Sequence, residues 1–144
     1  SVIRARRSAT RAAMGAFAHR DYLEKHGTPT ALEDVFSHRV IGQDRGDLIL
    51  RGMAALGVSS ERAAFAFRTD HPIASWELLR AGAGIGFAQV AIAARAPELV
   101  RILPGLHIEP LPYWLCSHRE LRHSAKVRRV YDFLAERLAA LPLG

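Results

Sequence analysis

The sequence predicts an α/β protein with a largely parallel sheet, because short apolar strand-like runs alternate with helical runs along the chain. Strand-like segments at 85–87 and 99–102 are bounded by glycine or proline, and apolar residues recur at helical spacing in 48–56 and 127–138. The length of 144 residues predicts one domain. Hydrophobic residues make up 49% and charged residues 24%, which is typical of folded chains and excludes a disordered one.

The first third is expected to start extended over residues 1–18, with the small apolar run 12–18 as a buried strand. A short helix over 21–26 follows, and Gly27 suits the position after its last residue. Thr30 and Glu33 fit a capping box, which predicts a second short helix.

The middle of the chain predicts a strand at 39–41 and then a helix opened by Asp44 and Asp47 and ended by Gly57. Alternating Phe65 and Phe67 predict a strand over 63–68.

The next helix is expected to start at Thr69-Asp70-His71-Pro72, with a capping Asp and a proline in its first turn, and to stop at Gly82. A strand at 85–87, a short helix at 90–95 and a strand at 99–102 follow.

The last third predicts a strand over 112–116 and a terminal helix capped by Ser124, with apolar residues at helical spacing up to Leu138. No apolar run approaches the roughly 18 residues of a membrane helix, and the start lacks the apolar stretch of a signal peptide. We therefore expect a soluble, cytoplasmic protein without a membrane partner.

The net charge of +6 raises the question of nucleic-acid binding. Residues 1–20 contain five arginines and no acidic residue, whereas residues 21–144 hold 15 basic and 14 acidic side chains. No zinc-finger spacing, basic zipper or RNA-binding aromatic motif accompanies the arginines. Direct DNA contact by these residues is therefore not expected.

Motifs of catalysis and metal binding are also missing. The glycine pattern at 82–86 follows a helix and opens a strand, the reverse of a dinucleotide fingerprint, and it predicts a helix end with close helix-to-sheet packing. The seven histidines form neither HExxH nor an i, i+4 pair, and no serine has a nucleophile-elbow context. The single Cys116 allows no internal disulfide and is interpreted as a buried small hydrophobe. We expect no catalytic residue, metal or cofactor.

Anion binding is the remaining chemistry. Thr69, Asp70 and His71 begin a helix whose N–H groups point toward the carboxyl end of the preceding strand, where α/β sheets place ligands. A carboxylate would fit there. Three alternatives stay open: Asp70 caps its own helix, Arg68 pairs with an internal acid instead of a ligand, and Trp76 lies in the core or an interface instead of stacking on a ligand.

Taken in order along nearly the whole chain, several segments resemble the effector-binding domain of LysR-type transcriptional regulators. They are His19-Arg20-Asp21-Tyr22-Leu23 with its preceding Ala18, His26-Gly27-Thr28-Pro29, 33–35, His38-Arg39-Val40-Ile41, 68–70, 79–87, 99–104 and 127–134.

The resemblance implies a fold like the type 2 periplasmic binding proteins, with two α/β lobes around a cleft. This chain would supply one complete lobe, lobe two, over about 15–110, and a return strand and helix of lobe one over about 111–144. A winged helix-turn-helix DNA-binding domain is expected to lie outside this chain.

The resemblance also implies a function. The chain would sense a small organic, anionic effector in the interlobe cleft and modulate DNA binding and transcription by the full-length protein, without enzymatic activity. Implied partners are a second copy in a homodimer or homotetramer and promoter DNA through the missing domain; contact with RNA polymerase stays open. The alternatives are a small-molecule binding or transport protein or an enzyme on the same fold, or a constitutive oligomerisation domain.

Carried over by position, the resemblance implies two sets of residues. The ligand-binding set is Ile41, Gln43, Arg68, Thr69, Asp70, His71 and Gln89. The dimer-interface set is Trp76, Leu79, Arg80, Ile85 and Phe87.

Overall fold

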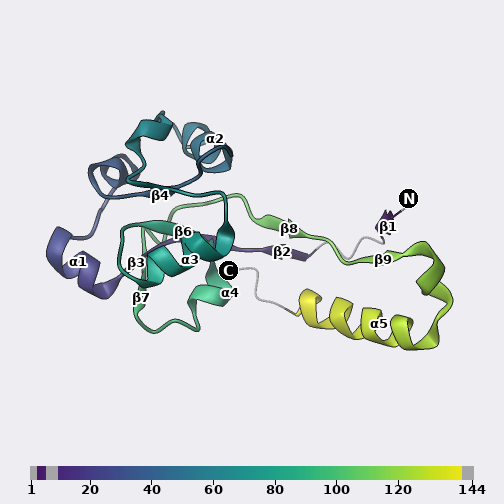
Figure 1. Ribbon diagram of the computed structural model, residues 1–144. Helices are drawn as coiled ribbons and strands as arrows, with labels where there is room; N and C mark the ends of the chain where they lie inside the picture. The colour runs from purple at the N-terminus through teal and green to yellow at the C-terminus, as the bar shows by residue number, and fades with distance from the viewer. Residues whose placement is uncertain (1–2, 6–9, 141–144) are drawn as a thin grey trace. The chain divides into compact units, whose positions relative to one another are not determined.

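The computed structural model describes residues 3–5 and 10–140 and divides the chain into two units (Figure 1). One unit comprises residues 14–109 and the other residues 1–13 with 110–144. The remaining part of the expected extended start, residues 1–2 and 6–9, lies outside the described residues. Among the described helices, none has the length and apolar character needed to cross a membrane.

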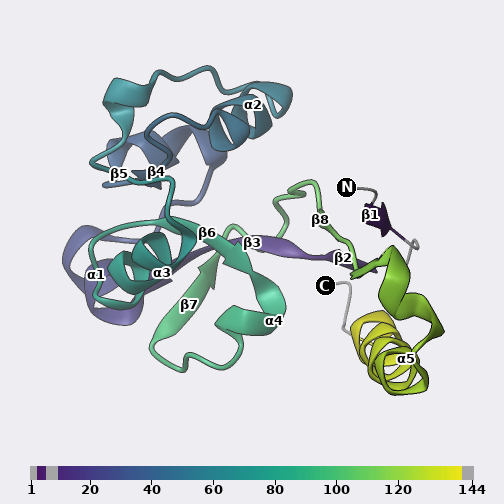
Figure 2. The ribbon, with the colours of Figure 1, turned by 45° about the vertical axis from the view of Figure 1, so that its right-hand side comes forward.

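The sheet of the 14–109 unit is built around β3 (Met14–His19), which lies between β6 (Gly86–Gln89) and β7 (Leu99–Ile102) and is antiparallel to both (Figure 2). Beyond β6, β4 (Ile41–Gly42) pairs in parallel with β5 (Phe67–Arg68).

A parallel bridge between Val40 and Ile85 connects β4 to the start of β6. The prediction of a largely parallel sheet is therefore correct for β4, β5 and β6 and wrong at β3, because the apolar run of a buried strand does not encode its direction.

Helices cover both faces of this sheet, and the strands alternate between two cores. On β3, Ala16 and Ala18 join one cluster and Phe17 joins the other. Val40, just before β4, and Ile41 on β4 divide in the same way. The first cluster lies under α1 (Arg20–His26), the 3₁₀ helix η1 (Leu32–Ser37) and α2 (Leu48–Ala55). The second lies under α3 (Pro72–Arg80) and α4 (Val90–Ala93).

Most helix ends lie where the sequence places them. Gly27 ends α1 with a φ of 79°, and its N–H donates to the Leu23 carbonyl at 2.8 Å. The capping box predicted for Thr30 and Glu33 lies one residue later, at Ala31 and Asp34. The carboxylate of Asp34 accepts from the Ala31 N–H at 3.2 Å, so the second helix starts one residue later than predicted.

The strand predicted over 63–68 is also shorter than expected. Arg62–Ala64 forms the 3₁₀ helix η2, and β5 covers only Phe67–Arg68. The Arg62 guanidinium donates to the carbonyls of Asp44 and Arg45, both at 2.8 Å, and this holds the chain in a turn before the strand.

The other unit contains two antiparallel ribbons and a helix. β1 (Ile3–Ala5) pairs with β9 (Cys116–His118), and β2 (Thr10–Ala12) pairs with β8 (Leu111–Tyr113). The single strand predicted over 112–116 is wrong, since the chain leaves the ladder between β8 and β9.

After β9 come the 3₁₀ helix η3 (Arg119–His123) and α5 (Ala125–Ala139), whose N-cap residue is Ser124, although no side-chain hydrogen bond caps the helix. The Tyr131 hydroxyl donates to the Leu115 carbonyl at 3.1 Å. Cys116 is exposed, so the interpretation as a buried hydrophobe is wrong; its two-stranded ribbon does not enclose it.

Candidate functional site

The predicted ligand-binding residues gather where the parallel strands end. β4 and β5 run side by side, so the loop 43–47 and the segment 69–71 leave the sheet at the same edge. The Thr69 N–H donates to the Gly42 carbonyl at 3.0 Å and continues the ladder into this edge.

Asp70 does not cap its own helix, so that alternative is wrong. Its carboxylate accepts from the N–H of Gly46 at 3.0 Å and of Arg45 at 2.9 Å, which lie on the opposite loop. These two backbone donors hold the pKa of Asp70 below its ordinary value, because they stabilise the ionised form. The N-cap of α3 is His71, whose Nδ1 accepts from the Ala74 N–H at 3.4 Å.

Arg68 meets an internal acid. Its Nε lies 3.6 Å from a carboxylate oxygen of Asp44, and both side chains are 49% exposed. Because the pair is long and half exposed, it stabilises little and leaves the guanidinium accessible to a ligand.

The N–H groups at the start of α3 are largely occupied. The His71 N–H donates to Thr69 Oγ1 at 3.1 Å, and the Ser75 N–H donates to the His71 carbonyl at 3.0 Å. An anion at this edge therefore depends on the Arg68 guanidinium more than on bare backbone donors.

The other predicted ligand-binding residues are placed differently. The Ile41 side chain is 1% exposed and belongs to the core, so it presents no surface to a ligand. The Gln43 Oε1 accepts from the Ile49 N–H at 3.1 Å and thereby braces the start of α2. Gln89 is half-buried at the end of β6, which runs parallel to β4 through the Val40–Ile85 bridge and so ends toward the same edge.

The predicted interface residues divide into core and surface. Leu79 and Ile85 are 2% and 0% exposed and pack inside the unit, so neither side chain offers contact surface. Trp76 and Phe87 are half-buried. Arg80 is exposed and bonds Glu98 at 2.7 Å.

A family model, described as the LysR substrate binding domain, matches residues 3–139. The chain belongs to this family. It is an effector-sensing regulatory domain of a LysR-type regulator, with the periplasmic-binding-protein-like type 2 fold that the resemblance implied. Domains of this family are regulatory and generally not enzymatic.

Solved structures of LysR-type regulators have the same fold. The regulatory domain of CrgA from Neisseria meningitidis is 21% identical, with a TM-score of 0.78 over 96% of this chain and 70% of that one. The AmpR effector binding domain from Citrobacter freundii is 18% identical, with a TM-score of 0.72 over 96% of this chain and 69% of that one. A longer CrgA structure from Neisseria meningitidis is 23% identical, with a TM-score of 0.74. The match covers 96% of this chain and 48% of that one. No curated protein matches the sequence.

Two residues at this edge of the LysR substrate binding domain are not predicted from the sequence. Asp44, which the sequence predicts only as the start of a helix, also faces Arg68, and Arg62 bonds the Asp44 carbonyl. An acid and a base on different loops carry no spacing signal, so only the fold reveals them. Within the described residues, no group of three His, Cys, Asp or Glu is arranged to hold a metal ion.

Proposed function

We propose that this LysR-type domain binds a small organic anion at the edge formed by the loops after β4 and β5, and that binding changes how the full-length regulator sits on DNA. The main support for this proposal is the accessible guanidinium of Arg68, which lies just before the start of α3 at the carboxyl ends of parallel strands. Gln43, Thr69, His71 and Gln89 complete the proposed ligand-binding set.

Residues 15–110 form lobe two in this proposal, and residues 111–144 return to lobe one. The division of the chain near residues 13 and 110 supports the assignment. So do the apolar side chains of Val130 and Phe133 on α5, which are 58% and 59% exposed and would pack against the rest of lobe one. The ligand shifts the population between two lobe arrangements, and no bond is made or broken.

A homodimer or homotetramer is part of the same proposal, because LysR regulators act as oligomers and bind DNA through a separate domain. On α3 and α4 of this chain, Ile73 and Ile92 are 65% and 45% exposed, and Trp76 is half-buried. These side chains, rather than the enclosed Leu79 and Ile85, are the ones we expect at an isologous contact. A cytoplasmic location follows from binding to promoter DNA.

The test is a thermal-shift screen of the protein against small aliphatic and aromatic carboxylates, with Arg68→Gln beside Arg95→Gln. Arg95 is exposed on the turn after α4, so its substitution removes the same charge away from the proposed edge. We expect at least one carboxylate to stabilise the protein. Its Kd should rise about tenfold to a hundredfold in Arg68→Gln, because a charge-assisted hydrogen bond is lost, and should be unchanged in Arg95→Gln. An equal response of the two variants would remove Arg68 from the site.

A further inference from the structure

An internal ion pair lies at the proposed effector edge, which is formed by the loops after β4 and β5. The Nε atom of Arg68 is 3.6 Å from Oδ1 of Asp44, and each side chain is 49% exposed. Among residues 3–5 and 10–140, neither side chain has another hydrogen bond or ion pair. A ligand carboxylate that reaches Arg68 therefore either displaces the Asp44 carboxylate or shares the guanidinium with it, and in both cases the two carboxylates are neighbours.

Other charged groups at the effector edge have closer partners. The carboxylate of Asp47 lies 3.2 Å from Nε of Arg51, one turn further along α2. The Arg62 guanidinium donates to two backbone carbonyls of the 43–47 loop, both at 2.8 Å. Asp70 accepts from two backbone N–H groups of the same loop. The long, half-exposed pair of Arg68 and Asp44 is thus the one that a ligand exchanges at least cost.

The effector edge carries no excess of positive charge. Three arginines and three acidic residues belong to it or bond its loop: Arg45, Arg62, Arg68, Asp44, Asp47 and Asp70. The charge of Arg45 acts on Asp70, where it adds to the backbone N–H groups of Gly46 and Arg45 in lowering the pKa of that carboxyl. A ligand that brings only negative charge gains Arg68 but also meets the carboxylate of Asp44. The edge is better suited to a ligand that carries both signs of charge.

We propose that the effector is an amino carboxylate, whose carboxylate pairs with Arg68 and whose ammonium group pairs with Asp44; this inference rests on the effector edge proposed above. Such a ligand replaces one internal ion pair by two charge-assisted pairs of its own. Because Arg68 and Asp44 are neighbours, the two ligand groups must be neighbours too, as they are on the α-carbon of an amino acid. An anion without the ammonium group leaves two carboxylates side by side, and like charges at such a separation repel.

The variant Asp44→Asn distinguishes the two kinds of ligand, because it changes their affinities in opposite directions. For an amino carboxylate it removes the partner of the ammonium group. For a plain carboxylate it removes a competitor for Arg68 and a repelling charge. The Asp44 carboxylate is dispensable for the fold, since Arg62 bonds the backbone carbonyl of Asp44 and the exposed pair with Arg68 stabilises little.

The experiment is isothermal titration calorimetry of the 144-residue protein with α-amino acids, each beside the carboxylic acid that lacks only the amino group. Examples are alanine beside propionate, leucine beside isocaproate and phenylalanine beside phenylpropionate. We expect the amino acid that binds most tightly to have a Kd at least about fivefold below that of its partner acid. Asp44→Asn should raise the Kd of the amino acid about fivefold to tenfold and lower the Kd of the partner acid. Asp47→Asn removes the same charge from the same loop but faces Arg51, so both Kd values should stay near the wild type.

Several results would overturn the pairing of an ammonium group with Asp44. They are equal binding of an amino acid and its partner acid, tighter binding of both in Asp44→Asn, equal losses in Asp44→Asn and Asp47→Asn, and a folded protein that binds none of the amino acids. The proposed function is judged separately, on Arg68→Gln and any organic carboxylate. Partner acids that lose binding in Arg68→Gln support the effector edge even where the pairing with Asp44 fails. Binding of both kinds of ligand that survives Arg68→Gln would remove both proposals.

Discussion

Substituting Gly84 by alanine is expected to separate β4 from the start of β6. A Cβ at residue 84 would overlap the carbonyl oxygen of Arg39 and would lie 2.9 Å from its carbonyl carbon, against an ordinary contact of 3.4–4 Å. That carbonyl accepts from the Ile85 N–H at 2.8 Å, so the alanine would force apart β4 and the start of β6. No side-chain rotation relieves a clash with backbone.

The cost is about 2–4 kcal/mol, combining overpacking of about 1–3 kcal/mol with about 1 kcal/mol for the weakened hydrogen bond. At roughly 2–4 °C per kcal/mol for a chain of this size, the Tm should fall by about 5–15 °C.

Gly52→Ala is the matched control for Gly84→Ala. Gly52 lies in α2 with no neighbour within 4 Å of an added Cβ, and its φ is not positive, so alanine should stabilise by about 0.5–1 kcal/mol. Thermal and urea unfolding followed by circular dichroism measure both changes. Equal shifts for the two variants, or a Gly84→Ala protein as stable as the wild type, would refute the close approach of Gly84 to Arg39.

Three further predictions concern hydrogen bonds and charge. Tyr22→Phe should lower the free energy of unfolding by about 1–3 kcal/mol in urea titrations, because the buried Arg39 N–H loses its acceptor; a neutral result would mean that water replaces the hydroxyl. The Tm should fall as the pH drops through about 4 and below, because the lowered pKa values of Asp70 and Glu98 mean that the folded state favours the ionised carboxylates; Asp70→Asn should flatten this profile, and an unchanged profile would contradict the role of its carboxylate. Arg80→Gln should raise the pKa of Glu98 toward its ordinary value in a ¹³C-carboxyl NMR titration, because Arg80 is the main cause of the lowered value; an unmoved titration would exclude that contact.

The fold was predictable to the extent that it depends on local patterns. Helix ends at Gly27, Gly57 and Gly82 have positive φ, where glycine is favoured, so the residue type alone marks them. The strand 99–102 and the strand after Gly84 were also placed correctly, because buried apolar runs between turn residues are distinctive.

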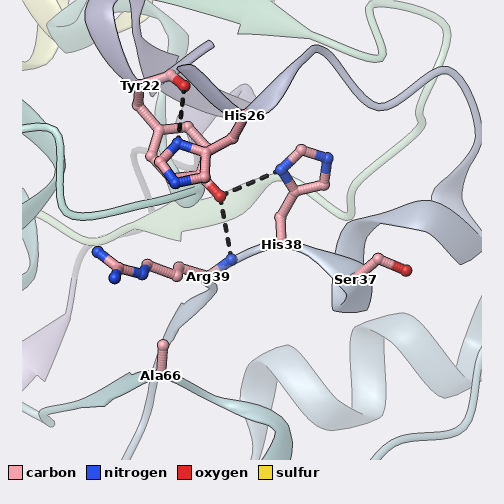
Figure 3. A pocket seen from close by; sticks show the side chains of 6 residues that line it. All are labelled: Tyr22, His26, Ser37, His38, Arg39 and Ala66. Carbon is pink, nitrogen blue, oxygen red and sulfur yellow. Dashed lines mark hydrogen bonds between the residues drawn. The ribbon is translucent and has the colours of Figure 1, made fainter.

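Features that depend on contacts between distant segments were not predictable. The direction of β3, the 3₁₀ helix at Arg62–Ala64 and the break between β8 and β9 are set by neighbours far along the chain. The cavity lined by Tyr22, His38 and Arg39 was not predicted for the same reason (Figure 3). The Tyr22 hydroxyl bonds His38 and the Arg39 N–H, which lie 16 and 17 positions further along the chain, and no spacing rule for metal or catalytic histidines describes such a group.

At the edge formed by the loops after β4 and β5, where we propose that the effector binds, an internal carboxylate already occupies backbone donors. The sequence placed an anion-binding site at the start of α3, and the structure has a carboxylate hydrogen-bonded to backbone N–H groups there, but that carboxylate is Asp70 on the donors of the 43–47 loop. Asp70 therefore uses the kind of contact that a ligand carboxylate would seek, and its charge repels a second anion at short range. An anionic effector must then be held by the guanidinium of Arg68, whose present partner Asp44 is 3.6 Å away and easily displaced. Arg68 and not the helix start is therefore the residue on which effector affinity at this edge should depend.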